Sequence, residues 1–398
     1  MKEGYRLLGD FIQPIDERNK ELKVDYLLGV SISKQFIPSI ANIVGTDLSN
    51  YKIVRTGQFA YGPVTSRNGE KISIALLRDS DCIISSSYTV FEVTDKDQLD
   101  PEYLTLWFSR PEFDRYARFK SHGSVREIMD WDEMCKVELP VPSIDKQRSI
   151  VKAYQTITER IELKRRINDN LAKTIKAVFK SWFLDFDAFD GVELVQSQYG
   201  LIPNGWHYEL LGNLCDCVTK GTTPTTLGKD FTDTGINFIK GESINDDHSF
   251  NKTLFAHIDD ETDELLKRSR IYVNDIVFTI AGTLGKFALV DSSVIPANTN
   301  QAVAIIRTSK IMPAMLYSYF IGEWQVEFYK RNTQQAVQAN LSLGTIKDLP
   351  ILLPDSKGQD HYMQLVTPLI VGMQNNFSEI ERLYELQNQL LARLSSSR

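Results

Sequence analysis

Polar side chains that could hydrogen-bond to the edges of DNA bases gather in Gly-, Ser- and Thr-rich stretches of this chain. In such contacts Asn and Gln suit adenine, Arg and Lys suit guanine, and Ser and Thr suit either base. The candidate DNA-binding residues are Gln58, Tyr61, Arg67, Asn68, Ser86, Tyr88, His122, Ser124 and Arg126 in the first half, and Lys220, Thr222, Thr223, Lys240, Thr283, Lys286, Asn300, Gln301, Gln334, Gln335 and Asn340 in the second. For any single position, the alternative is a surface turn that touches no ligand.

The sequence lacks the motifs of catalysis. The stretch AGTLGK (Ala281–Lys286) suits close backbone approach to phosphate, but it lacks the full P-loop pattern. There is no Asn-Pro-Pro-aromatic stretch of the kind used by amino-methyltransferases, the histidines occur singly, and the four cysteines lack paired zinc-ligand spacing. We therefore predict a chain that is not an enzyme and binds no cofactor or metal itself. An enzyme with an unrecognised active site is the alternative.

Composition is that of a globular protein. Of the 398 residues, 42% are hydrophobic and 24% are charged, and no run of eighteen apolar residues occurs. We expect a cytoplasmic protein with reduced thiols and no contact with a membrane. The formal net charge of −7 argues against indiscriminate coating of nucleic acid, although a basic face can lie within an acidic whole.

The chain contains a tandem repeat. YRLLGDF (Tyr5–Phe11) recurs as YELLGNL (Tyr208–Leu214) at an offset of 203 residues, and further along the offset becomes 212. At that offset Val90, Phe91 and Val93 match Ala302, Val303 and Ile305, and Trp107 and Phe108 match Tyr319 and Phe320. Such self-similarity predicts a duplicated structural unit.

Each copy has the same order of predicted elements. Short apolar runs bounded by Gly, Ser and Asn predict strands, namely Lys71–Leu77, Asp275–Ile280 and Ala302–Arg307. An aromatic-rich helix is predicted next, over Pro101–Phe119 and again over Pro313–Tyr329. A Leu-Pro stretch and a long helical pattern follow in both copies.

The long helices carry a 3.5-residue apolar period that is typical of a coiled coil. The predicted seam contains Ile150, Ile157, Ile161, Leu171, Ile175, Leu369, Met373, Ile380, Leu383 and Leu390. Lys164, Asn168, Asn376 and Gln387 interrupt it, either to fix the register or at splayed, hydrated positions. Pro368 and Gly372 predict a kink or a late start in the second helix.

These patterns predict an α+β fold with two mixed α/β target-recognition domains in a tandem pseudo-two-fold repeat. The predicted domains are residues 1–140 and 188–350. Two long spacer helices, in residues 141–187 and 351–398, would pair as an antiparallel coiled coil. Such a protein matches the local two-fold symmetry of duplex DNA, with one half-site for each domain. A coiled-coil scaffold that binds only proteins is the alternative.

The first long helix is basic. From Asp145 to Lys180 it has ten basic and four acidic side chains, a net charge of +6. This face could meet DNA, an acidic protein partner or only solvent.

The chain resembles the specificity subunits of type I restriction-modification systems. The resemblance covers essentially the whole chain and rests on GSVREIMDWDEM, VELPVPSIDKQRSIV before the first long helix, SWFLDFDAFDGV after it, and GLIPNGWHYELLG. It implies that each recognition domain reads one half of a bipartite, asymmetric site in double-stranded DNA. It also implies that the coiled coil sets the spacer and docks two methyltransferase subunits, which a restriction/translocase subunit joins in phage defence. S-adenosylmethionine, ATP and magnesium are then expected on those partners.

Overall fold

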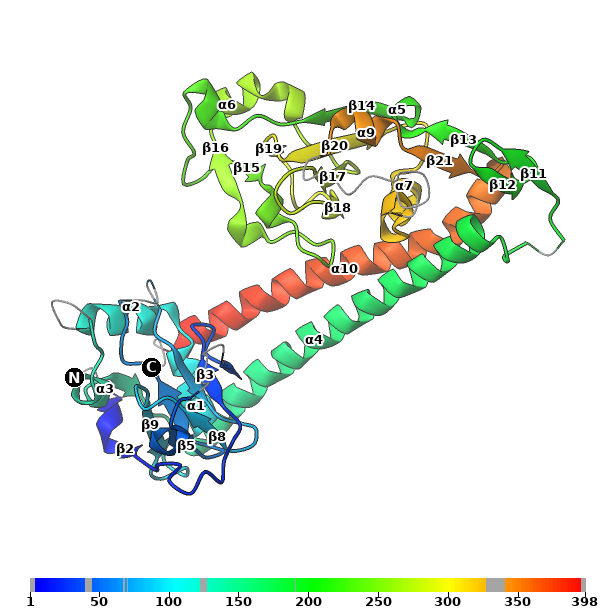
Figure 1. The fold of residues 1–398 in the computed structure, drawn as a ribbon. Coiled ribbons are helices and arrows are strands. Elements are labelled where there is room, and N and C mark those ends of the chain that lie inside the picture. Colours follow the sequence, from blue (N-terminus) through cyan, green and yellow to red (C-terminus); the bar gives the residue numbers. More distant parts are fainter. Residues whose placement is uncertain are drawn as a thin grey trace. The chain divides into compact units, whose positions relative to one another are not determined.

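The computed structural model describes residues 4–39, 45–66, 69, 71–121, 127–189, 191–326 and 341–394. The chain forms two compact units, with residues 1–161 and 381–398 in unit 1 and residues 162–380 in unit 2. Two long helices, α4 (Ile144–Lys180) and α10 (Ser356–Leu394), each contribute to both units (Figure 1). Within the described residues, no helix combines the length and the apolar character needed to cross a membrane.

Unit 1 is built on a four-stranded antiparallel sheet. Its order is β2 (Ile12–Ile15), β9 (Thr89–Val93), β6 (Phe59–Tyr61) and β7 (Ile74–Leu76). One face packs on α1 (Pro101–Phe108) and α2 (Pro111–Lys120), and Phe59 and Phe91 stack there with ring centroids 4.9 Å apart. The other face covers the paired strands β3 (Leu28–Val30) with β4 (Phe36–Pro38) and β5 (Lys52–Val54) with β8 (Cys82–Ile84). The short helix α3 (Trp131–Cys135) and the pair β1 (Tyr5–Leu7) with β10 (Glu138–Pro140) complete the unit.

The single helix predicted over Pro101–Phe119 is wrong, because α1 ends at Phe108 and α2 begins at Pro111. Proline has no backbone N–H and clashes with the preceding turn, so it is favoured where a helix begins. Asp100 caps the first helix by accepting from the N–H groups of Glu102 and Tyr103.

Unit 2 has a four-stranded antiparallel sheet and a second sheet beside it. The first has the order β14 (Cys215–Lys220), β20 (Val303–Thr308), β17 (Ile276–Thr279) and β18 (Phe287–Leu289). The second has the order β16 (Ala256–Ile258), β15 (Ile236–Ile239) and β19 (Ala297–Thr299), with β15 and β19 parallel. The remaining described strands and helices are the pairs β11 (Leu194–Ser197) with β12 (Gly200–Pro203) and β13 (His207–Leu210) with β21 (Pro350–Leu353), and α5 (Leu211–Leu214), α6 (Asp260–Leu265), α7 (Pro313–Ile321) and α9 (Leu343–Lys347).

The two four-stranded sheets have the same order along the chain, with the last strand between the first and the second. Their side chains correct the predicted strand alignment by one residue. Phe91 faces the helices of unit 1, whereas Val303, its predicted match, faces the second sheet of unit 2. Ala304 faces the helices, so an offset of 213 matches the faces. A slip of one residue exchanges the two faces of a strand.

The long helices agree with the predicted spans and correct one detail. The first was predicted from about Asp145 to Phe183, and α4 with the π-helical turn Ser181–Asp185 covers that span. Pro368 and Gly372 predicted either a kink or a late start in the second helix. The late start is wrong, because α10 already begins at Ser356. Its two ends lie in different units, so each unit stabilises one of them.

Polar groups join α4 to α10 within unit 2. Asn376 Nδ2 donates to Asn168 Oδ1 at 2.7 Å, and Lys164 Nζ lies 3.0 Å from Asn376 Oδ1 and 2.8 Å from Glu379 Oε2. Residue numbers in these contacts fall along α10 as they rise along α4, and the contact of Trp182 with Tyr362 continues this trend. Asn168 and Asn376 are buried, so they are not splayed into solvent.

The predicted seam residues differ in burial. Ile157, Ile161, Ile175, Met373 and Ile380 are buried, whereas Ile150, Leu171, Leu369, Leu383 and Leu390 are partly buried. In unit 1 the residues of α4 and α10 that are buried in the core of that unit are Val151, Leu391 and Leu394, rather than the predicted Ile150 and Leu390. Gln387 Nε2 donates there to Thr158 Oγ1 at 2.7 Å.

We predict that Asn376→Ala lowers the free energy of unfolding of unit 2 by about 1–3 kcal/mol, because Asn168 and Lys164 would each be left without this partner. The urea midpoint followed by circular dichroism measures the effect. Asn375→Ala is the matched control, since Asn375 is the next residue in the chain and its side chain is exposed. Its free energy of unfolding should stay within about 0.5 kcal/mol of the wild-type value. Equal midpoints for the two variants would contradict the structural role of Asn376.

Candidate nucleic-acid interface

Those predicted DNA-binding residues of unit 2 that the structure describes come from segments that meet at one turn, residues 300–302, which joins β19 to β20. Asn300 Oδ1 accepts from the Ala302 N–H at 3.0 Å, which holds the turn closed. Gly221 N donates to Asn300 O at 3.0 Å, and Thr223 Oγ1 lies 2.5 Å from Gln301 Oε1. The structure therefore brings Thr222 and Thr223 beside Asn300 and Gln301.

Gly221 permits this close approach because it has no side chain. A Cβ atom placed on Gly221 would lie 1.7 Å from the Thr299 carbonyl oxygen, which no other residue could tolerate without a backbone shift. Lys220, at the end of β14, is thereby held close to the 300–302 turn.

Two further candidate segments reach the same turn. Lys240 follows Ile239, which pairs with Thr299 in the parallel register of β15 and β19. Ile280 N donates to Ala302 O at 2.8 Å, which places the start of the loop containing Thr283 and Lys286 beside the turn. Four separate segments thus converge on one polar surface, as contacts to base edges require.

The cations of this surface differ in how they are neutralised. Lys286 Nζ lies 2.9 Å from Asp246 Oδ1, so the predicted approach of this loop to phosphate must compete with an ion pair. Lys240 Nζ lies 4.8 Å from the centre of the Phe231 ring, in a cation–π contact. Lys220 is exposed.

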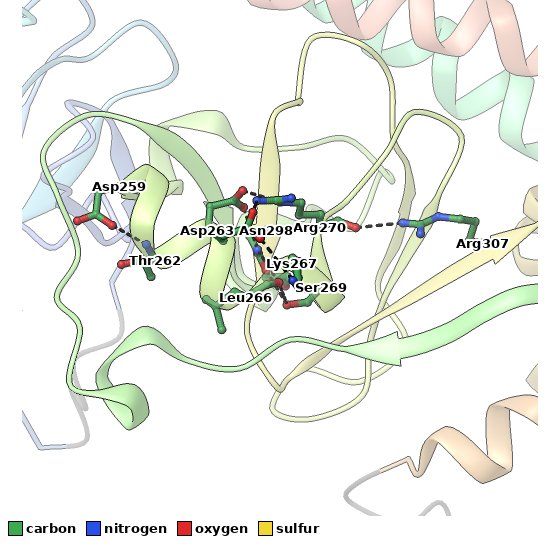
Figure 2. A network of polar contacts seen from close by, with 11 residues as sticks. Asp259, Thr262, Asp263, Leu266, Lys267, Ser269, Arg270, Asn298 and Arg307 are labelled. Atoms are coloured by element: carbon green, nitrogen blue, oxygen red, sulfur yellow. Dashed lines mark hydrogen bonds and ion pairs between the residues drawn. The ribbon is translucent and has the colours of Figure 1, made fainter.

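Asn298, two residues before the turn, is completely buried and all four hydrogen-bonding positions of its amide are occupied. Its Nδ2 donates to Asp263 Oδ1 and Leu266 O, both at 3.1 Å. Its Oδ1 accepts from Ser269 Oγ at 2.7 Å and from the Thr299 N–H at 2.9 Å. Figure 2 shows this amide between α6 and the 3₁₀ turn η7 (Lys267–Ser269).

Arginines extend this network to the main sheet. Arg270 Nε donates to Asp263 Oδ2 at 2.6 Å, and Arg307 Nη2 of β20 donates to Arg270 O at 3.0 Å (Figure 2). Arg307 also forms a bidentate pair with the buried Asp275, which raises the pKa of the guanidinium. At the start of α6, hydrogen bonds from Thr262 lower the pKa of the Asp259 carboxyl group.

His248 supports the loop that contains Lys286. Its ring stacks on Phe287 with centroids 4.0 Å apart, and Nδ1 is buried with no hydrogen-bond partner among the described residues. Burial lowers the pKa of His248, although the neighbouring Asp247 and Asp246 act in the opposite direction.

In unit 1 the structure corrects two predicted DNA contacts. Gln58 and Tyr61 are buried, the first accepting from the Arg55 N–H at 2.8 Å and donating to Glu92 at 2.9 Å. Tyr61 lies in β6 against Phe91. Neither side chain can reach a base edge from these positions, so both have packing roles instead.

The other predicted residues of unit 1 lie in loops. Ser86 is exposed and Tyr88 is partly buried, both between β8 and β9. Thr65 N donates to Glu127 O at 3.0 Å. The chain just before the candidates Arg67 and Asn68 therefore lies beside the chain just after the candidate Arg126. Arg67, Asn68, His122, Ser124 and Arg126 lie outside the described residues, as do Gln334, Gln335 and Asn340 of unit 2.

Sequence reasoning missed the network around Asn298. One signal could have found it, because asparagine is depleted in strands and Asn298 is the central residue of a short strand. The partners Asp263, Leu266 and Ser269 gave no local signal, since they are about thirty residues away in the sequence and meet Asn298 only in the fold.

The four cysteines are free, with Cys82 buried and the other three partly buried. Within the described parts of the chain, no group of three or more His, Cys, Asp or Glu side chains could hold a metal ion.

Comparisons with known proteins place similarity in both units. A family model described as the type I restriction modification DNA specificity domain matches residues 55–173 and 203–381. The type I restriction enzyme MjaIX specificity subunit of Methanocaldococcus jannaschii is 24% identical over 308 residues, which cover 76% of this chain and 70% of that protein. The HindI specificity subunit of Haemophilus influenzae is 22% identical over 426 aligned residues, covering 89% of each chain. The crystal structure of a type I restriction-modification system S subunit from M. genitalium shares the fold, with a TM-score of 0.50, 14% identity and coverage of 98% of this chain and 95% of that one.

We predict that Asn298→Ala lowers the free energy of unfolding of unit 2 by about 3 kcal/mol or more. Asp263, Leu266, Ser269 and the Thr299 N–H would each lose a hydrogen bond to the amide, and one hydrogen bond contributes about 0.5–1.5 kcal/mol net. Urea unfolding measures the change, with Asn204→Ala, at an exposed asparagine of the same unit, as the control. A loss of stability for Asn298→Ala no larger than that of the control would show that the network contributes little.

We also predict a pH effect at His248. The unfolded imidazole has a pKa of about 6.5, and the folded one has a lower pKa, so the unfolded state takes up the proton first. The folded protein therefore has its full stability above about pH 6.5, where His248 is neutral in both states, and it loses stability as the pH falls towards the pKa of the folded state. The urea midpoint of the wild type should fall more steeply than that of His248→Phe between about pH 7.5 and 5.5, on either side of that unfolded pKa. Parallel pH profiles for the two proteins would refute this.

Proposed function

This chain belongs to the type I restriction-modification DNA specificity family, and on that basis we propose that each unit reads one half of a bipartite, asymmetric DNA site. Its relatives are specificity subunits, so the chain is a DNA-recognition subunit rather than an enzyme. The observation that carries the proposal is the double match, because one specificity domain falls mainly in each unit.

In unit 2 we assign the reading of one half-site to the surface around the 300–302 turn. Asn300 and Gln301 offer amides to base edges, and Lys220, Thr222, Thr223, Lys240, Thr283 and Lys286 surround them. The buried amide of Asn298 supports this assignment, because a fixed turn is needed for base discrimination. Residues 188–350 form the second recognition domain in this proposal.

In unit 1 we assign the other half-site to residues 1–140. Ser86 and Tyr88 remain candidates, together with Arg67, Asn68, His122, Ser124 and Arg126. The same strand order in both main sheets supports a common origin for the two readers, and hence the pseudo-two-fold repeat.

We propose that α4 and α10 form one antiparallel coiled coil that sets the spacer between the half-sites. At ~1.5 Å per residue, the 37 residues of α4 would extend about 55 Å. The contacts of Asn168 with Asn376 and of Thr158 with Gln387 support this pairing, since buried polar pairs specify register.

The helices would also dock two methyltransferase subunits, with a restriction/translocase subunit completing the complex. In this proposal S-adenosylmethionine, ATP and magnesium bind to those partners and not to this chain. The basic face of α4 could serve either the DNA or an acidic partner surface.

Selection from random duplex DNA by the reconstituted methyltransferase complex tests the proposal. We expect a gapped motif, with Asn300→Ala plus Gln301→Ala relaxing one half and Tyr88→Ala relaxing only the other. Removing one side chain that reads a base should reduce discrimination at that position by about 1–3 kcal/mol. The two variants serve as controls for each other. A continuous motif, or a change in both halves from either variant, would contradict separate readers.

A further inference from the structure

Lys220 and Arg268 form an exposed basic pair beside the 300–302 turn. Arg268 Nη2 lies 3.4 Å from Lys220 O, so the guanidinium crosses the end of β14. Both side chains are exposed, and no ion pair links either of them to a carboxylate of the described residues.

Other basic side chains of unit 2 contrast with this pair. Lys229 pairs with Glu261 at 2.6 Å, Lys267 with Glu264 at 3.4 Å, and Lys286 with Asp246 at 2.9 Å. Arg270 and Arg307 pair with Asp263 and Asp275. In a chain whose net charge is −7, two neighbouring cations without such carboxylates form a place where an external anion can bind.

The pair is held on both sides at a fixed distance from the turn. On one side Gly221, next to Lys220, donates to Asn300 O and has no room for a side chain. On the other side Arg268 lies between Leu266 and Ser269, and both of these bond to the amide of Asn298. The backbone that carries the pair is therefore anchored to the residues that are proposed to read bases.

We propose that Lys220 and Arg268 bind a backbone phosphate of the DNA half-site whose base edges face the 300–302 turn. This inference rests on the proposed function of unit 2. Both cations match the anionic oxygens of a phosphate, and Arg can bind two of them at once. Such a contact fixes the register of the protein on the duplex and carries no sequence information of its own.

Salt dependence separates this role from base reading. Binding of the reconstituted complex to its selected motif is measured across a series of salt concentrations for wild type, Arg268→Ala, Lys220→Ala and the double variant. Removing one phosphate contact should reduce the slope of log K against log salt by about 0.9. The selected motif should stay the same in both halves, because the weakening is uniform across sequences.

Lys229→Ala is the matched control, because Lys229 is a cation of the same unit that is already neutralised by Glu261. Its slope should equal that of the wild type. Arg268→Lys should restore most of the slope, since it keeps the charge. A wild-type urea midpoint verifies that each variant is folded, and an unchanged first half-site motif verifies that the complex is assembled. If Arg268→Ala does not fold, Lys220→Ala, at an exposed strand end, gives the same test.

Wild-type slopes for Arg268→Ala and Lys220→Ala would overturn the phosphate assignment. So would a changed motif in the second half-site, because the residues would then read bases. A wild-type complex that returns no gapped motif would instead refute the proposed function of the units. The two failures are therefore distinguishable.

Discussion

The buried amide of Asn298 is the interaction on which the proposed recognition surface of unit 2 depends. Three of its four hydrogen bonds join α6 and η7 to β19, immediately before the 300–302 turn, and the fourth comes from the Thr299 N–H within β19. Because a buried amide is costly when unsatisfied, these bonds can all form only in one arrangement of the three elements. The polar surface outside can therefore vary in residue type while its backbone stays in place.

A similar constraint operates where α4 meets α10. Apolar side chains alone would allow two helices to slide by a heptad at little cost, whereas the amides of Asn168 and Asn376 must meet each other. Lys164 adds a charge that needs both Asn376 and Glu379. Register in the helices and geometry at the turn thus both come from buried polar groups that must pair with one another.

The sequence predicted the long helices well because their pattern repeats many times. One irregular position, such as Pro368, does not outweigh a period that extends over 39 residues. Strands of three to six residues have no such redundancy, so the alignment of Phe91 with Val303 was wrong by one residue. Gln58 was misjudged because its burial depends on Glu92, a residue of a neighbouring strand. The partners of Asn298 were missed for the same reason.

Base discrimination needs both a phosphate contact and a fixed turn. A contact to a base edge contributes about 1–3 kcal/mol of discrimination only if the side chain arrives at the correct base pair. Phosphate contacts determine that position, although they add affinity equally for every sequence. If Lys220 and Arg268 moved relative to Asn300, the same phosphate contact would allow several registers, and discrimination would disappear while affinity remained. The network around Asn298 holds the backbone on either side of Arg268 beside the turn, so in this proposal it would act on specificity although none of its own buried side chains would touch DNA.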